Sequence, residues 1–238
     1  MEFETSKESL HILCSKSPKG DNFKILGITF DTKLIMYAVV VSIVGEVGAK
    51  IKMLMRVRPF YSKLAMVSLY KCHILPFIES GMSAYYHAHP SILKLIDEIQ
   101  DSFCESMHIS KRDAMLEFNL APLALRRDIE MLGVLHKVAL GIAPAPLQEL
   151  FKHNSSDLHS FGFQNGTIFH SRKLQDSVGV NSPVMMKRSL FGLVFVYNRL
   201  AQSVVNANSV KQFRRRLLCI AKDCIDNNPK WEFVFHRI

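Results

Sequence analysis

The chain has 238 residues, of which 48% are hydrophobic and 21% are charged. This composition excludes an intrinsically disordered chain, and the length allows one large domain or two small ones. Lys and Arg number 30 against 21 Asp and Glu, so the net charge is +9. Such an excess favours a polyanionic partner, either nucleic acid or an anionic membrane surface; the alternative is that it serves solubility alone.

The part of the chain before residue 32 is expected to form a β-hairpin. Residues 9–14 and 23–30 are predicted as strands on either side of the turn-rich residues 17–21. A lone hairpin is only marginally stable in water. This one should therefore pack on the helices that follow, or belong to the edge of a larger sheet.

Residues 32 to 151 are expected to form a helical domain. Asp31 or Thr32 can cap its first helix, and Ser62 and Ser110 can cap later ones, because their side chains accept hydrogen bonds from free backbone N–H groups. Pro76 should kink or end the second helix. The expected helices span 32–56, 62–79, 90–107, 110–118, 123–140 and 146–151.

Two local features of this domain need an explanation. Gly133 costs about 1 kcal/mol of helix propensity in the interior of its helix, which the close approach of a neighbouring helix would explain. The most apolar stretch, 34–49, contains Glu46 and two glycines and is shorter than the ~20 residues that cross a bilayer. A buried helix is therefore predicted there, and no membrane partner is expected.

Beyond residue 151 the composition changes. Ser, Asn, Gly, His and Asp dominate the segment up to 186, and the Asn-Gly pair within 161–169 is typical of a tight hairpin. Two helices follow, at 187–201 and from Ser209, where Ser209 and Gln212 form a capping box. The predicted fold class is mainly α, a helical bundle with a small N-terminal hairpin. Its parts are the hairpin (1–31), a helical domain (32–151), a linker (152–186) and a C-terminal helical subdomain (187–238).

Five short blocks occur along the chain in a fixed order. They are 23–27 (FKILG), 99–100 with Phe103, 122–123 with 126–127, 135–137, and 188–190 with 196–200. Together they resemble the C-terminal part of non-LTR (LINE-type) retrotransposon reverse transcriptases, from the primer-grip strand through the thumb. The resemblance covers at least residues 22–235. It implies a thumb-like helical bundle that follows a hairpin remnant of the palm.

The resemblance carries over no catalytic residue, because it places the polymerase carboxylates before residue 1. Two-metal phosphoryl transfer needs carboxylates that converge on one point, and the chain has no Asp-Asp pair. We therefore expect no enzyme and no cofactor, since only the missing palm would require Mg²⁺.

The cysteines indicate neither disulfides nor zinc. Five cysteines lie at wide spacing behind an N-terminus without a secretory signal. This predicts reduced thiols in a nuclear or cytoplasmic protein that is not secreted. Cys219, Cys224 and His236 offer three candidate ligands at the wrong spacing, whereas a structural zinc site needs four. No metal site is expected.

The candidate binding residues come from the resemblance and from clustered charge. The resemblance implies that Phe23, Leu26 and Gly27 form the primer-grip turn. Arg126 and Arg127 lie in the first turn of a helix, where the dipole disfavours cations, so an acidic neighbour such as Glu130 or a phosphate should hold them. The remaining candidates form two basic clusters. One lies at the end of the first long helix and just beyond it (Lys50, Lys52, Arg56, Arg58 and Lys63), and the other covers the polar side of the last helix (Lys211, Arg214 and Arg215). For these clusters the alternative is a solvated helix face, and for Arg126 and Arg127 it is structural ion pairing.

These observations lead to two functional hypotheses. The first is a truncated, catalytically silent fragment of an RNA-directed DNA polymerase that still binds an RNA–DNA or DNA duplex without sequence preference. The missing fingers and palm segment is a further candidate partner. The second is a helical scaffold whose apolar faces bind a protein and which has no role with nucleic acid.

Overall fold

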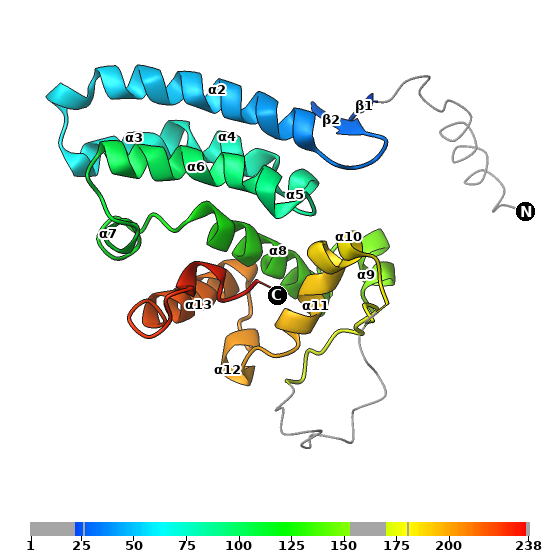
Figure 1. Cartoon of the computed structure of the whole chain (residues 1–238). Helices are drawn as coiled ribbons and strands as arrows, with labels where there is room; N and C mark the ends of the chain where they lie inside the picture. Colours follow the sequence, from blue (N-terminus) through cyan, green and yellow to red (C-terminus); the bar gives the residue numbers. More distant parts are fainter. Residues whose placement is uncertain (1–21, 26, 153–169, 180, 237–238) are drawn as a thin grey trace, which may run out of the picture.

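The computed structural model of the chain describes residues 22–25, 27–152, 170–179 and 181–236. It is mainly helical, with a two-stranded antiparallel hairpin ahead of the first helix (Figure 1). This confirms the predicted fold class. The strand expected at 9–14 and the hairpin expected at 161–169 lie outside the described residues.

The hairpin differs from the prediction in the position of its strands and turn. Residues 23–30 do not form one strand; β1 (Asn22–Ile25) pairs with β2 (Ile28–Asp31), and Phe23 lies opposite Phe30. The chain reverses at Gly27, whose φ of +87° is a conformation that residues with a Cβ rarely adopt. The rings of Phe23 and Phe30 stack with centroids 5.5 Å apart, so a cross-strand pair stabilises the turn.

The long helix α2 (Tyr37–Arg56) follows the hairpin. The predicted cap by Asp31 or Thr32 is wrong: the N-cap is Met36, with a φ of +65° and no side-chain cap hydrogen bond. The Asp31 carboxylate instead accepts hydrogen bonds from the N–H groups of Ile35 (2.9 Å) and Met36 (2.7 Å) in the turn before the helix. Next come η1 (Arg58–Phe60) and α3 (Lys63–His73), where Ser62 Oγ accepts the Ala65 N–H at 3.2 Å. Pro76 lies in the first turn of a separate helix, α4 (Leu75–Ser80), which confirms the predicted break.

Three further helices complete the N-terminal core. They are α5 (Met82–Tyr85), α6 (Pro90–Ser106) and α7 (Lys111–Leu116), and Ser110 Oγ caps α7 by accepting the Asp113 N–H at 3.1 Å. Tyr70 and Phe103 stack at 4.5 Å in the centre of this core. Among the described residues, no helix combines the length and apolar character needed to cross a membrane.

The C-terminal core forms around α8. Its helices are α8 (Leu123–Ala139), α9 (Ala145–Leu150), α10 (Val184–Arg188), α11 (Leu190–Tyr197), α12 (Gln202–Val205), α13 (Val210–Asp223) and the short η3 (Trp231–Phe233). The single helix expected at 187–201 is thus wrong, since the chain breaks at Ser189. A Cβ on Gly192 would lie 1.8 Å from the Lys187 carbonyl oxygen. The turn between α10 and α11 is therefore too tight for any residue other than glycine at this position.

Two buried histidines hold the C-terminal core together. His136 stacks on Phe213 with centroids 4.0 Å apart, and its ring nitrogens lie 3.1 Å from Tyr197 Oη and 3.0 Å from the Ala207 carbonyl. His170 Nε2 lies 2.8 Å from the Tyr197 carbonyl. Burial lowers the pKa of His136 to about 4 and also lowers the pKa of His170. Both rings are therefore neutral at physiological pH.

The described part of the expected linker is packed. Leu174 is fully buried, and its backbone exchanges hydrogen bonds with the Asn198 side chain at 2.9 and 2.8 Å. Residues 170–178 consequently belong to the C-terminal core rather than to a free connection. The two cores meet at α8: Leu123 packs in the N-terminal core, whereas Leu125, Leu132 and Leu135 pack in the C-terminal one.

Candidate nucleic-acid interface

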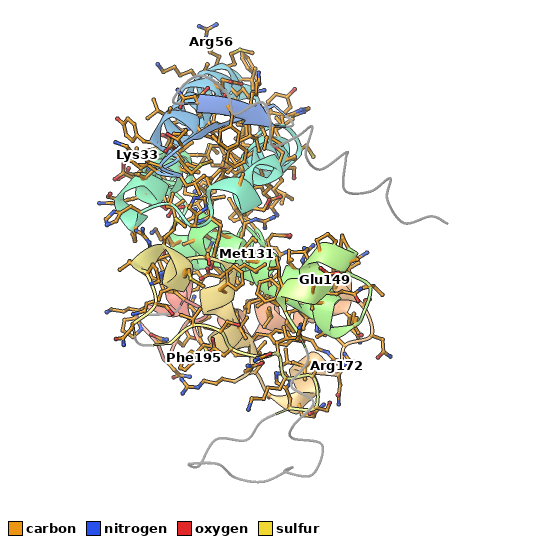
Figure 2. The ribbon with its side chains drawn as sticks, turned by 90° about the vertical axis from the view of Figure 1, so that its right-hand side faces the viewer. Lys33, Arg56, Met131, Glu149, Arg172 and Phe195 are labelled. Carbon is orange, nitrogen blue, oxygen red and sulfur yellow. The ribbon has the colours of Figure 1, made fainter. Side chains whose placement is uncertain are left out.

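The end of α2, η1 and the start of α3 form a basic surface, which we call the basic tip (residues 50–63). The sequence contains no Asp or Glu from residue 47 to residue 78. Lys52 and Arg56 are exposed, Arg58 is half-buried, and none of the three makes an ion pair or a side-chain hydrogen bond with another described residue. In Figure 2, Arg56 lies at an extremity of the molecule, remote from Met131 of α8. Three cations are thus left to the solvent or to a partner.

The two other predicted cations of the tip already have local contacts. Lys50 Nζ lies 4.6 Å from the centroid of the Phe77 ring, a cation–π geometry. Lys63 Nζ donates a hydrogen bond to the His108 carbonyl at 3.1 Å. Neither contact neutralises the charge, because a ring and a carbonyl carry no net charge. Both residues therefore still add to the positive potential of the tip.

The tip also exposes aromatic rings that the sequence analysis missed. Phe60 is 82% exposed and Tyr61 is 52% exposed. They lie in the short connection between α2 and α3, directly after Arg58 and Pro59 and just before Lys63. The signal that could have identified them is two consecutive aromatic residues inside a basic, acid-free segment, where no helical stripe requires them.

A second basic surface is the groove between α4, α8 and α13, which we call the α8–α13 groove. Its volume is about 340 Å³. It brings together predicted residues that are far apart in sequence, together with two carboxylates. The lining residues are Glu79, Arg126, Ile129, Glu130, Lys211, Arg214, Arg215 and Leu218.

Two of the cations that line the groove form ion pairs. Arg126 Nε donates to Glu79 Oε1 at 2.6 Å, and Arg214 Nη2 lies 2.5 Å from Glu130 Oε2. Lys211 and Arg215 remain exposed beside them. Burial and the nearby charges of Arg126 and Lys222 lower the pKa of Lys71. Positive charge is therefore concentrated here, but two of the four lining cations are paired with carboxylates.

Gly133 explains how α8 and α13 approach each other. A Cβ at this position would lie 2.5 Å from Arg214 Nε, so the Arg214 side chain crosses α8 at the glycine on its way to Glu130. The predicted close approach is confirmed. The contact comes from the side chain of a neighbouring helix.

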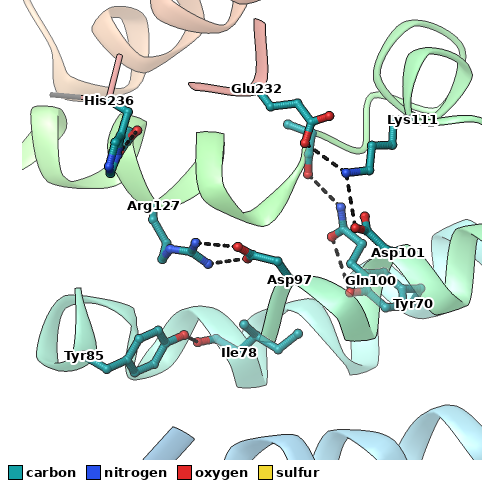
Figure 3. Close-up of polar contacts among 12 residues, drawn as sticks. Tyr70, Ile78, Tyr85, Asp97, Gln100, Asp101, Lys111, Arg127, Glu232 and His236 are labelled. Atoms are coloured by element: carbon teal, nitrogen blue, oxygen red, sulfur yellow. Dashed lines mark hydrogen bonds and ion pairs between the residues drawn. The ribbon is translucent and has the colours of Figure 1, made fainter. Parts of the chain in front are cut away.

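Arg127 requires a correction as a binding residue. Its side chain is buried, with 4% of the residue exposed, and it forms two hydrogen bonds to the Asp97 carboxylate at 2.5 and 2.8 Å (Figure 3). The expected ion-pair partner, Glu130, belongs to Arg214 instead. Arg127 therefore joins α6 to α8 and has no surface to offer a phosphate.

The implied primer-grip residues lie apart from the basic tip. Phe23 is half-buried in its stack with Phe30, Gly27 is exposed, and Leu26 lies outside the described residues. The hairpin lies at the N-terminal end of α2 and the basic tip at its C-terminal end (Figure 1). A 20-residue helix spans roughly 30 Å, so the structure does not bring these groups together.

A cavity of about 410 Å³ lies where the C-terminal segment meets α6 and α8. Ion pairs cross it: Lys111 Nζ lies 3.2 Å from Asp101 Oδ2 and 3.0 Å from Glu232 Oε2 (Figure 3). His236 lies 3.6 Å from the buried Asp128, and this contact raises the pKa of His236. These contacts fasten the C-terminal segment to the rest of the protein.

No cluster of three or more His, Cys, Asp or Glu side chains in the described part of the chain is placed to hold a metal ion. The candidate ligands Cys219 and His236 have separate environments, since Cys219 is an exposed thiol and His236 pairs with Asp128. No protein-family model, curated protein or solved structure matches the chain. The geometry of the site and the resemblance of the sequence blocks are thus the basis for a functional proposal.

Proposed function

We propose that this chain binds nucleic acid without sequence preference through the basic tip, as a catalytically silent remnant of a LINE-type reverse transcriptase thumb. The observation that carries the proposal is the set of unpaired cations Lys52, Arg56 and Arg58 in a segment without acidic residues. Free cations on a protruding surface are what a phosphate backbone requires, because binding then releases condensed counterions and breaks no internal ion pair.

The proposal is tested by measuring affinity for a fluorescein-labelled RNA–DNA hybrid by anisotropy, over salt concentrations from about 50 to 200 mM. The variant Lys52→Gln/Arg56→Gln/Arg58→Gln should lower the slope of log K against log salt by about 2 to 3, since each phosphate contact contributes about 0.9. Its stability should stay within about 0.5 kcal/mol of the wild type, because the three side chains have no folded-state partner.

A matched control makes the same change in net charge as the tip variant, but at positions outside the tip. Lys137, Lys152 and Lys230 are exposed lysines of the C-terminal half. Their replacement by Gln reduces the net charge by three from +9, to +6, as in the tip variant. The control should keep most of the wild-type slope. Equal losses in both variants would show that overall charge, not the tip, governs binding, and that result contradicts the proposal.

A protein-binding scaffold is the second candidate. Ile35, just before α2, and Tyr37 and Val41, in its first turns, are about half exposed although they are large and apolar. Their position beside the hairpin would suit the missing palm segment as a partner. Absence of salt-dependent binding to the hybrid, together with a salt-insensitive complex with a palm-containing polypeptide, would favour this function.

A further inference from the structure

We infer that the basic tip is a single-strand reader, in which Phe60 and Tyr61 stack on unpaired bases while the flanking cations hold the phosphates. This inference rests on the proposed function, because it concerns the same surface. It specifies the partner more narrowly as single-stranded DNA or RNA instead of a duplex.

The first observation is the position of the two rings. Phe60 has the highest exposed fraction, 82%, among the large apolar side chains that are exposed in the described chain. By contrast, Tyr70, Phe103 and Phe213 are fully buried in the two cores. A ring held in water forgoes the favourable free energy of burial. Packing in a core therefore does not explain why Phe60 occupies this position.

The second observation is that the backbone of the tip is held in place. The Phe60 N–H donates to the Val57 carbonyl at 3.0 Å, and the Tyr61 N–H donates to the Arg58 carbonyl at 3.3 Å. Pro59 restricts the turn further, and Ser62 caps α3 directly behind it. The rings are consequently presented from an ordered turn, which lowers the entropic cost of stacking a base on them.

The third observation is charge complementarity. Arg56 and Arg58 precede the rings, Lys63 follows them, and no acidic residue lies between positions 47 and 78. Aromatic rings flanked by cations suit a flexible single strand of nucleic acid, because its phosphates and its bases can be bound at the same time. In a duplex the bases are stacked on each other, and only their edges are accessible in the grooves. The rings would then gain nothing from duplex binding.

The test compares two probes, an oligo(dT) of about 15 nucleotides and a DNA duplex of the same length, under identical salt. The wild type should bind the single strand more tightly. Phe60→Ala and Tyr61→Ala should each weaken oligo(dT) binding about 5- to 100-fold, the range measured for loss of one stacked base. Neither substitution should change duplex binding or the salt slope, because no charge is removed.

Leu64→Ala is the matched control. Leu64 is an exposed apolar residue of the same surface, 64% exposed, but it has no aromatic face. It should leave oligo(dT) affinity within about twofold of the wild type. Because Phe60, Tyr61 and Leu64 are largely in solvent, all three variants should unfold at the wild-type temperature, which separates a binding defect from misfolding.

The outcomes distinguish this inference from the function on which it rests. Equal binding of both probes, with no effect of Phe60→Ala, overturns the single-strand inference and leaves nucleic-acid binding intact. Binding of neither probe overturns both proposals. A basic surface with exposed aromatic rings also suits an anionic membrane. Sedimentation with phosphatidylcholine–phosphatidylserine vesicles in the absence of oligo(dT) binding would therefore reject the inference in favour of a lipid partner.

Discussion

The basic tip and the α8–α13 groove both collect basic residues but differ in what surrounds their cations. In the tip, Lys52, Arg56 and Arg58 have no described partner. In the groove, Arg126 and Arg214 each meet a carboxylate, and so does Arg127 elsewhere on α8. These partners lie far away in sequence, as with Glu130 and Arg214. Clustered charge in a sequence therefore cannot tell a binding surface from a packing interface until the fold brings the acidic partners in.

The difference leads to the expectation that the paired cations govern stability and the tip cations govern binding. The largest effect should follow removal of the partner of Arg127. Asp97→Ala leaves a buried guanidinium unpaired and should lower the free energy of unfolding by about 3 kcal/mol or more. Urea denaturation followed by circular dichroism measures this. Glu98→Ala is the control: its pair with Lys94 is exposed, so the loss should stay below about 0.5 kcal/mol. A mild effect of Asp97→Ala would refute a structural role for this pair.

Acid should destabilise the C-terminal core before the N-terminal core. His136 has a pKa of about 4 in the folded protein against an ordinary 6.5, so between these values only the unfolded chain binds the proton. Stability should therefore fall by about 2–3 kcal/mol as the pH drops from 6.5 to 4. His170, also buried with a lowered pKa, acts in the same direction. The raised pKa of His236 acts oppositely, since its contribution is lost as the pH rises.

Trp231 reports this acid effect locally, because it is the only tryptophan and packs in the C-terminal core. Urea denaturation between pH 4 and 7, followed by its fluorescence, should show the loss. In His136→Gln the pH dependence should flatten, whatever the absolute stability of that variant. An unchanged slope in His136→Gln would assign the effect to other groups.

A smaller effect should identify the crossing of α8 by Arg214. Gly133→Ala gains up to about 1 kcal/mol of helix propensity, but the added methyl group would displace the Arg214 side chain. We expect the gain to appear in an Arg214→Ala background and to be absent or reversed in the wild type. The coupling energy from this double-mutant cycle should be about 1 kcal/mol. A cycle without coupling would show that the guanidinium moves aside at no cost.

The smallest effect should come from releasing the groove cations. Glu79→Gln/Glu130→Gln frees Arg126 and Arg214. If the tip is the binding surface, affinity for the RNA–DNA hybrid should change by less than about twofold at 150 mM salt, because distant charges are screened beyond roughly 8 Å. A rise of about 2 in the salt slope would instead show that the groove contacts phosphates.

Local signals in the sequence predicted most helix boundaries. The caps at Ser62 and Ser110 and the break at Pro76 depend only on neighbouring residues, so they could be predicted without a fold. The turn at Gly27 was implied by the resemblance alone. The residues themselves predicted one strand over 23–30, because strand-favouring residues lie on both sides of the glycine. The break at Ser189 was missed since the tight turn before Gly192 depends on backbone packing.

The candidate site was predictable in its charges but not in its pairing. The tip cations were found because a run of basic residues without acidic neighbours is visible in the sequence. The burial of Arg127 was not, since it depends on α6 placing Asp97 against α8. Phe60 and Tyr61 were missed for a different reason. Aromatic residues usually fill cores, so the sequence analysis did not single out this pair, although its basic, acid-free surroundings offered a signal.

Helix α8 has a consequence for any shortened form of the protein. One side of its first turn closes the N-terminal core, and the rest of the helix, from Leu125 to Ala139, supplies the centre of the other. A polypeptide that stopped soon after α9 would keep α8 but lose α11 and α13, leaving a row of leucines facing water. Such a product would be prone to aggregation, and chaperones would bind it or proteases would degrade it. Selection against early stop codons would therefore act on this chain through its folding, whether or not the lost helices touch any ligand.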